Sequence, residues 1–182
     1  MSTIDSYFHC VADVLPRIPA EPVERIVGIL RDAQANGRCI FMFANGGSSA
    51  NASHLVNDFV KSVRVAGRPR MRALCLSDNT PLLTALANDL SYDVVFSDTL
   101  AALADPGDVA FALSGSGNSP NVLRAMEVAQ TKGLTRIGLT GRGGGALAPL
   151  CDVAVIVPTD SMQIIEDAHL VILHAIFLAL CA

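Results

Sequence analysis

Five short apolar runs, separated by segments long enough to form helices, constrain the fold of this 182-residue chain more than any other feature. The runs are residues 38–44, 71–76, 108–113, 135–139 and 152–157, bounded by Gly, Asp and Pro. A short run that is apolar throughout is typical of a strand buried on both faces of a parallel sheet. The pattern therefore predicts an α/β fold with a parallel sheet flanked by helices.

The rest of the chain predicts the helices. Residues 3–36 have apolar side chains at helical spacing and break at Pro16, Pro19 and Pro22, which indicates two N-terminal helices. Further helices are expected at residues 50–65, 82–90, 92–104, 119–131, 145–150 and 164–180. The last of these is apolar nearly all round, which is typical of a core helix or a subunit interface. We expect a single domain over residues 1–182, without repeats or linkers.

Composition narrows the classes of partner. The hydrophobic fraction is 51%, more than one core needs, which suggests apolar surface buried between subunits. The formal net charge is -4, and Lys and Arg cluster only at Lys61, Arg64, Arg68 and Arg70, so we expect no nucleic-acid partner. A small anionic ligand remains compatible with this charge.

Compartment is predicted from the cysteines and the N-terminus. Five scattered cysteines, mostly in apolar runs, are typical of reduced core residues. Asp5 and Asp13 lie where a signal peptide needs basic and apolar residues, and no uninterrupted apolar stretch reaches about 18 residues. We therefore expect a soluble, cytoplasmic protein with no membrane partner.

Two turns between a predicted strand and the next helix are rich in Gly, Ser and Asn. They are Asn45-Gly46-Gly47-Ser48-Ser49 and Ser114-Gly115-Ser116-Gly117-Asn118-Ser119. Both lie at carboxyl ends of strands, where parallel sheets bind ligands. Gly lets the backbone approach an anion, Ser hydroxyls donate to it, and a helix N-terminus favours negative charge. One such turn is ordinary loop chemistry, but two at matching positions favour a phosphate site. Neither is a Walker A loop or a dinucleotide fingerprint.

Ionisable side chains on two helices are the other candidates. His54 and Asp58 are four residues apart and project from one helix face, either as an exposed pair or as part of a site. At about 100° per residue, Glu166 and His174 lie some 80° apart around the last helix, whereas His169 and His174 lie some 140° apart. Glu166 and His174 therefore form the better pair, and His169 is interpreted as a hydrogen-bonded structural residue. An apolar helix turns ionisable groups inward only where they are paired, metal-bound or functional.

These motifs resemble the phosphoheptose isomerase family of SIS-domain proteins. The matching segments are Asn45-Gly46-Gly47-Ser48, residues 114–122, Gly138-Leu139-Thr140-Gly141 and Glu166-Asp167-Ala168-His169. The resemblance covers nearly the whole chain, including the N-terminal helices. It implies a SIS domain with a flavodoxin-like five-stranded parallel sheet. It also implies a homotetramer with active sites between subunits, in which residues 1–36 serve oligomerisation.

The same resemblance implies a set of site residues. Substrate would be bound by Asn45, Gly46, Gly47, Ser48, Asp58, Asn88, Asp89, Ser114, Gly115, Ser116, Ser119 and Glu166. Zinc would be held by His54, Asp58, Glu166 and His174. Asp58 would be the catalytic base and His174 its acid/base partner, with Glu166 as the other carboxylate able to move a proton.

The chain departs from the family pattern at three of these positions. Asp58 replaces the usual Glu, Glu166 replaces the usual Gln, and Gly115 stands where Thr is common. Two carboxylates repel an anionic sugar phosphate unless a cation or a protonated His174 compensates. Because two imidazoles and two carboxylates suit zinc, a divalent metal is expected more strongly than the family pattern alone implies. The replacements could equally mean a shifted substrate.

The resemblance implies an aldose–ketose isomerase that converts sedoheptulose 7-phosphate to a heptose 7-phosphate through an enediolate, for bacterial heptose biosynthesis. One alternative is a non-catalytic SIS tetramer like the bacterial protein that binds the DnaA initiator. That relative lacks the acidic residue and the late histidine that are present here as Asp58 and His174, which favours the enzyme. The other alternative, a sugar-phosphate sensor, is disfavoured because no DNA-binding domain is attached.

Overall fold

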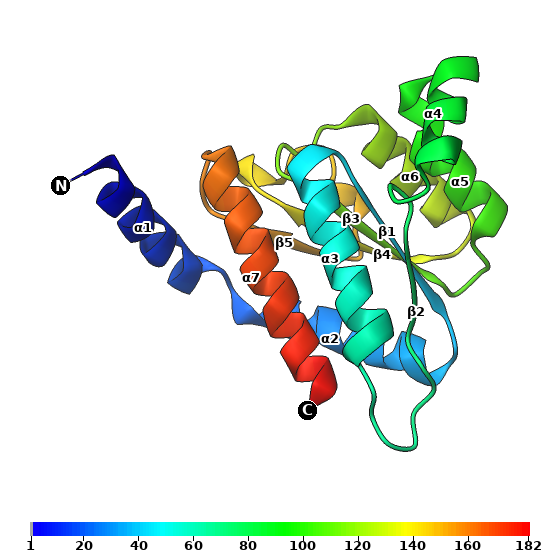
Figure 1. The fold of residues 1–182 in the computed structure, drawn as a ribbon, viewed down its shortest axis with the longest axis horizontal. Coiled ribbons are helices and arrows are strands. Elements are labelled where there is room, and N and C mark those ends of the chain that lie inside the picture. The colour runs from blue at the N-terminus through cyan, green and yellow to red at the C-terminus, as the bar shows by residue number, and fades with distance from the viewer. Residues whose placement is uncertain (1) are drawn as a thin grey trace.

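The computed structural model describes residues 2–182, and its centre is a five-stranded parallel sheet (Figure 1). The strand order is β2-β1-β3-β4-β5. The strands are β1 Cys39–Ala44, β2 Arg72–Cys75, β3 Val109–Ser114, β4 Thr135–Thr140 and β5 Val153–Ile156. All five predicted strands are present, within two residues of the predicted bounds. Every residue of β1 and β3 is buried, as their apolar runs require, whereas the edge strand β2 alternates between exposed and buried residues.

Residues 2–182 form seven α-helices, of which all but α1 pack around the sheet. They are α1 Thr3–Val14, α2 Ala20–Ala35, α3 Gly46–Ser62, α4 Thr80–Asp89, α5 Val95–Leu103, α6 Pro120–Thr131 and α7 Met162–Cys181. Two core clusters lie on opposite faces of the sheet. One contains Ile40 and Met42 of β1 with buried residues of α2, α3 and α7, and the other contains Phe41 and Phe43 with those of α5 and α6. Successive residues of β1 therefore serve two layers.

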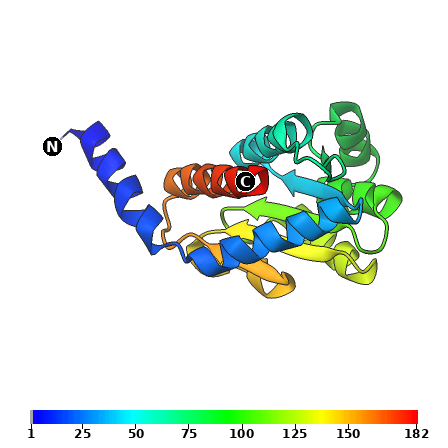
Figure 2. The same ribbon diagram turned by 90° about the horizontal axis from the view of Figure 1, so that it is seen from below.

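Helices α3 and α7 pack side by side on one face of the sheet and run in the same direction, whereas α1 extends away from the body (Figures 1 and 2). The hydroxyl of Tyr7 on α1 donates a hydrogen bond to Asp167 Oδ2 on α7, at 2.5 Å. This bond, with burial and the carboxylate charge, raises the pKa of Tyr7 to about 12. Ile4 and Phe8 of α1 remain 66% and 65% exposed. Ile4 and Phe8, one helical turn apart, therefore form an exposed apolar side of α1.

Helix α7 is long and apolar enough to cross a membrane by length and composition alone. However, 44% of its most apolar window is buried inside the fold, and its buried residues belong to the core cluster shared with α2 and α3. Its apolar character is explained by this packing.

Three sequence expectations about helices were wrong. Residues 145–150 do not form a helix: two short 3-10 turns, Arg142–Gly144 and Ala148–Leu150, lie on either side of Gly145, because three successive glycines adopt positive φ. Pro22 does not end a helix but lies in the first turn of α2, where its missing N–H is not needed. Helix α3 begins four residues earlier than predicted, at Gly46.

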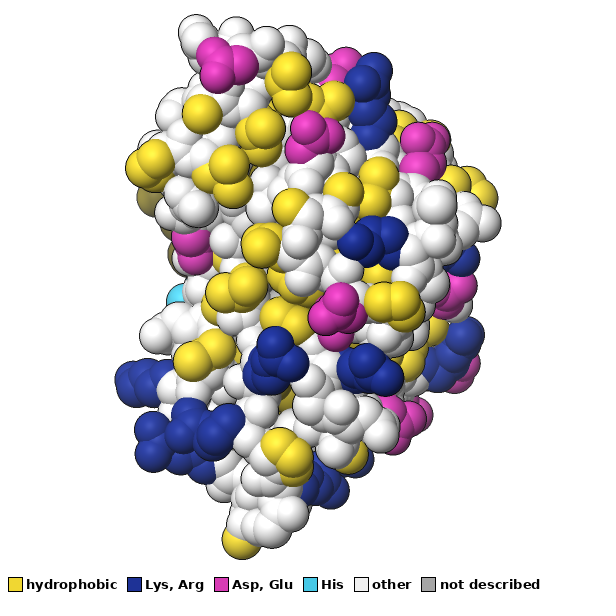
Figure 3. Space-filling model, turned by 90° about the vertical axis from the view of Figure 1, so that its right-hand side faces the viewer, with side chains coloured by type: hydrophobic (Ala, Val, Ile, Leu, Met, Phe, Trp, Pro, Cys, Tyr) yellow, Lys and Arg dark blue, Asp and Glu magenta, His cyan; other side chains and the backbone are white. Residues whose placement is uncertain are grey.

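Basic side chains gather at one end of the molecule. The loop between α3 and β2 and its flanks contain the exposed residues Lys61, Arg64, Arg68, Arg70 and Arg72. In Figure 3 dark blue side chains collect at the lower end of the face, the end at which Figure 1 shows this loop. They lie at the opposite end of α3 from the turn that follows β1.

Candidate active site

The first turn ends β1 and opens α3. Asn45 is the N-cap residue, with φ -109° and ψ 153°, and Gly46 follows with φ +55°, a conformation that favours glycine. Gly47 packs against α7: a Cβ at this position would lie 2.8 Å from Glu166 Oε2. The absence of a side chain at residue 47 therefore lets the Glu166 carboxylate approach the start of α3.

The second turn, residues 114–119, is called the serine loop below. Ser114 is the last residue of β3, and its Oγ lies 3.3 Å from Ser119 Oγ, within hydrogen-bonding distance. The Asn118 N–H donates to Ser116 Oγ at 3.2 Å, and Pro120 occupies the first position of α6. Because β1 and β3 are neighbours in the sheet, the serine loop and the first turn lie at the same edge.

A cavity of about 260 Å³ lies between the two turns and the start of α7. It is lined by Asn45, Gly46, Gly47, Ser48, Leu113, Ser114, Gly115, Ser116, Ser119, Met162 and Glu166. Nine predicted site residues are among them. Backbone amides and hydroxyls at two helix N-termini suit an anion, and Glu166 places a single carboxylate beside them.

Met162 occupies the space beside Gly115. A Cβ on Gly115 would lie 2.4 Å from Met162 Sδ, so the thioether fills the place where a larger residue would extend. The replacement of Thr by Gly115 is thus accompanied by an apolar wall from α7 in this chain.

Three predicted metal ligands come together farther along α3 and α7, beyond the turns at which these helices begin. His54 Nε2 lies 3.0 Å from His174 Nε2 and 3.3 Å from Asp58 Oδ2. Ligand atoms of these three residues all lie within 4.8 Å of one another. Nitrogen and oxygen ligands about 2 Å from a tetrahedral zinc ion are about 3.3 Å apart, so this donor set fits one divalent ion. The side chain of His54 is 47% exposed and that of Asp58 is 18% exposed.

Glu166 is not part of this cluster. It lies eight residues before His174, about 12 Å along the helix axis, and its carboxylate is turned toward Gly47. The expected pairing of Glu166 with His174 considered only the angle around the helix and not the distance along it. In the described structure the four predicted ligands therefore form one group of three, with Glu166 separate in the cavity.

Asn88 and Asp89 are also outside the cavity lining. They end α4, are exposed, and hydrogen-bond to each other, with Asn88 Nδ2 donating to Asp89 Oδ1 at 2.7 Å. Helix α4 lies with α5 and α6, away from α7 (Figure 1). The site residues of this segment are thus not brought to the cavity directly.

Two residues that the sequence analysis did not assign fix the side chain of Asn45. Asn121 is 1% exposed and exchanges two hydrogen bonds of 2.9 Å with the Asn45 amide. The Tyr92 hydroxyl donates to Asn45 Oδ1 at 2.8 Å. The signal for Asn121 was its place in the matched segment 114–122. Tyr92, three residues after Asp89, gave no comparable signal.

His169 is the structural residue that the sequence indicated. It is fully buried, and its Nε2 donates to the Thr140 carbonyl oxygen at 3.3 Å, since a carbonyl can only accept. Burial lowers the pKa of His169 to about 4, so the ring is neutral near pH 7. This bond joins the helix that contains Glu166 and His174 to the end of β4.

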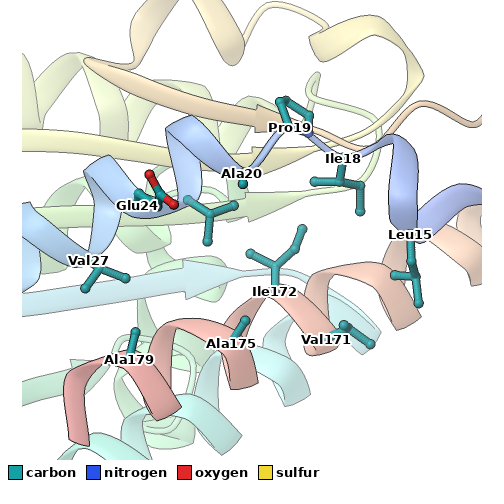
Figure 4. A pocket seen from close by; sticks show the side chains of 11 residues that line it. Leu15, Ile18, Pro19, Ala20, Glu24, Val27, Val171, Ile172, Ala175 and Ala179 are labelled. Carbon is teal, nitrogen blue, oxygen red and sulfur yellow. The ribbon is translucent and has the colours of Figure 1, made fainter. Parts of the chain in front are cut away.

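A larger cavity, of about 340 Å³, has a different chemistry (Figure 4). It lies between the start of α2 and the middle of α7 and is lined mainly by aliphatic side chains, including Ile18, Val23, Val171 and Ile172. Glu24 is its only charged lining residue. Such a lining suits apolar groups rather than a sugar phosphate.

Comparison with known proteins places this geometry in a family. Residues 6–141 match the model of the SIS domain family. The phosphoheptose isomerase of Paramagnetospirillum magneticum is 44% identical over 156 residues, which are 86% of this chain and 81% of that protein. The phosphoheptose isomerase structure from Francisella tularensis superposes with a TM-score of 0.91 at 26% identity, covering 99% of this chain and 98% of that one. For that from Neisseria gonorrhoeae the TM-score is 0.91 at 30% identity, covering 97% and 96%.

Proposed function

We propose a substrate for this chain, which belongs to the SIS domain family and is a sugar-phosphate isomerase of the phosphoheptose isomerase type. The proposed substrate is sedoheptulose 7-phosphate. The product is an aldose, a heptose 7-phosphate. The observation that supports this most is the polar cavity at the N-termini of α3 and α6, which includes the serine loop. Helices α3 and α7, which begin at this cavity, also hold His54, Asp58 and His174.

The phosphate group binds in the cavity. The hydroxyls of Ser114, Ser116 and Ser119 and the N–H groups in the first turn of α3 donate to its oxygens. Asn45 donates from its amide, whose oxygen already accepts from Tyr92 and Asn121. These contacts orient the sugar so that its carbonyl end extends toward His54, Asp58 and His174.

Isomerisation moves a proton between carbons 1 and 2. Asp58 removes the proton from carbon 1 of the ketose and returns a proton to carbon 2, through an enediolate. The negative charge that develops on the oxygen atoms of these carbons is stabilised by His174 or by the ion that it would hold. Asn88 and Asp89 reach substrate either by movement of α4 or from a neighbouring subunit.

A divalent ion, which we propose to be zinc, suits the cluster of His54, Asp58 and His174. When bound, it would supply positive charge that offsets the negative charge developing in the reaction. Glu166 joins the ligands only by turning away from Gly47. In its present orientation its carboxylate faces the phosphate site, where it weakens the binding of an anion.

Residues 1–36 and α7 provide the contact between copies of the chain. The support is the exposed Ile4 and Phe8 of α1, together with the aliphatic cavity that α7 forms with α2 (Figure 4). We propose a homotetramer with active sites near these contacts, in the cytoplasm. The exposure of His54 is consistent with a site completed by a neighbouring copy.

The test is incubation of the purified protein with sedoheptulose 7-phosphate, with and without a chelator, followed by NMR analysis of the products. We expect an aldoheptose 7-phosphate to form, and a loss of turnover in the chelated sample that added zinc reverses. Formation of no aldose with or without added zinc would contradict the proposed substrate. Full activity of the metal-free protein would contradict the proposed metal alone.

A further inference from the structure

The segment that follows β4, residues 141–147, has an unusual backbone and is called the glycine loop below. Four successive residues have positive φ: Arg142 (+46°), Gly143 (+73°), Gly144 (+97°) and Gly145 (+54°). Arg142 is the one non-glycine residue with positive φ among residues 2–182. A non-glycine residue is held in this region only where its surroundings over-determine the conformation. Arg142 is held by Thr159 and Asp160, whose carbonyls accept from its N–H at 3.3 Å and from its Nε at 3.1 Å.

Backbone groups of the glycine loop hydrogen-bond along the serine loop. The Gly141 N–H donates to the Gly115 carbonyl at 3.2 Å, and the Leu147 N–H donates to the Gly117 carbonyl at 2.9 Å. Between them, the Ala146 N–H donates to Asn118 Oδ1 at 3.0 Å. Asn118 Nδ2 in turn donates to the Ser116 carbonyl at 3.0 Å. The Gly115 and Gly117 carbonyls thus accept from the glycine loop, and the Ser116 carbonyl accepts from Asn118, whose side chain the glycine loop holds.

The two backbones approach so closely that no side chain fits between them. A Cβ on Gly117 would lie 2.2 Å from the Gly144 carbonyl oxygen, and a Cβ on Gly145 would lie 2.6 Å from the Ser116 carbonyl oxygen. Gly143, at the tip of the glycine loop, has nothing within 4 Å of such a Cβ. The contact therefore involves Gly141 and residues 144–147, which we call the brace, and not Gly143.

The bond between Gly141 and Gly115 also fixes the orientation of the peptide plane that joins Gly115 to Ser116. In a trans peptide the carbonyl and the following N–H point in opposite directions, and the described chain has no cis peptide. Because the Gly115 carbonyl points to the brace, the Ser116 N–H points away from it. Gly115 and Ser116 both line the cavity. The bond from Gly141 thus fixes the direction of an amide donor at a residue that lines the cavity.

We propose that the brace is a positioning element, which fixes the Ser116 N–H and the serine-loop hydroxyls in the geometry that binds the phosphate group. This inference rests on the proposed function, since it takes the serine loop as the phosphate site. It assigns a role to the glycines that follow β4, none of which lines the cavity. The brace does not touch substrate, so its loss affects binding of the phosphate more than the proton transfer.

Two alanine variants of the glycine loop form a matched pair. Gly145→Ala and Gly143→Ala both place a Cβ on a residue with positive φ, and only the first drives it into the serine loop. We expect Gly145→Ala to raise the dissociation constant of inorganic phosphate, measured by calorimetry, about tenfold, as loss of one hydrogen bond to a charged group would. The KM for sedoheptulose 7-phosphate rises in parallel, with a smaller change in kcat. Gly143→Ala keeps the parental phosphate affinity and KM and loses less thermal stability, since its Cβ meets no neighbouring atom.

Equal phosphate affinities of the two variants would overturn the proposal. If Gly145→Ala does not fold, Asn118→Ala removes the bonds to the Ala146 N–H and the Ser116 carbonyl without a clash. It should also weaken phosphate binding, and parental affinity in that variant would overturn the proposal as well. If the unsubstituted protein binds phosphate but does not isomerise the sugar, only the proposed function is contradicted. If the unsubstituted protein does not bind phosphate, the proposed function and the proposed role of the brace are both contradicted.

Discussion

His169 makes the stability of this protein depend on pH, because its ring must stay neutral in the folded state. The ring is fully buried, and its pKa is lowered from 6.5 to about 4, mainly by burial. In the unfolded chain the ring titrates near 6.5, so between pH 6.5 and pH 4 the unfolded state binds one more proton than the folded state. Acid therefore favours unfolding in this window. Above pH 6.5 the ring is neutral in both states and contributes no pH dependence.

The size of the effect follows from the shift in the pKa. Each pH unit is worth about 1.4 kcal/mol for one proton, so lowering the pH from 6.5 to 5 removes about 2 kcal/mol from the free energy of unfolding. Replacement by Gln keeps a side chain that can donate to the Thr140 carbonyl but does not titrate. The pH dependence of His169→Gln should be smaller than that of the parent by about this amount.

Urea unfolding followed by circular dichroism, at fixed protein concentration and at pH 7.5, 6.5 and 5, measures this difference. Other groups also titrate in this range, and comparison with His169→Gln removes their contribution, provided that they are unaffected by the substitution. We expect the two proteins to diverge below pH 6.5 and to have parallel stabilities above it. Identical pH dependence in the two proteins would refute a buried, neutral His169.

Three further predictions concern charge, metal and assembly. Glu166→Gln removes a carboxylate next to the serine loop and should lower the dissociation constant of inorganic phosphate several-fold, measured by calorimetry. The control is Glu127→Gln on the exposed side of α6, and an equal effect of both substitutions would contradict the placement of Glu166. His54→Ala should weaken zinc binding at least tenfold in a competition assay with a chromophoric chelator, whereas His9→Ala on α1 should leave it unchanged. If His54→Ala binds zinc with the parental affinity, the cluster is not the metal site. Phe8→Asp puts a charge on the exposed apolar side of α1 and should lower the molar mass measured by light scattering, and an unchanged tetramer mass would contradict a role for α1 in assembly.

The sheet was predictable from the sequence because its signal is strong and local. Strands β1 and β3 are buried on both faces, so their apolar runs admit few other interpretations. The helix expected at residues 145–150 failed where the argument relied on the position between strands and neglected the glycines at residues 143–145. The three glycines should have decided the prediction for this segment, since successive positive φ values cannot continue a right-handed helix.

The start of α3 shows the opposite failure. Gly46 and Gly47 are poor helix formers, and the prediction accordingly placed the helix start at residue 50. The helix begins at Gly46 because packing against α7 and the close approach of Glu166 fix this turn. Asn45, at the N-cap, does not cap the helix with its side chain, which instead bonds to Tyr92 and Asn121. Such contacts between distant segments leave no local pattern in the sequence.

The site was only partly predictable for the same reason. The two turns rich in Gly, Ser and Asn are visible as motifs, since each is local and lies at the end of a strand. The proximity of His54 to His174 depends on the packing of α3 against α7, and only the resemblance to a family indicated it. The angle around a helix did not reveal that Glu166 is separated from His174 by about two turns.

The most direct test of the central claim is the turnover of sedoheptulose 7-phosphate by Asp58→Asn, measured beside Asp98→Asn, an equivalent change on the exposed side of α5. If Asp58 moves the proton of a sugar whose phosphate is held by the serine loop, Asp58→Asn loses at least about 100-fold in kcat and keeps the parental affinity for inorganic phosphate. Asp98→Asn retains the parental kcat. Turnover by Asp58→Asn at the parental rate would contradict the account.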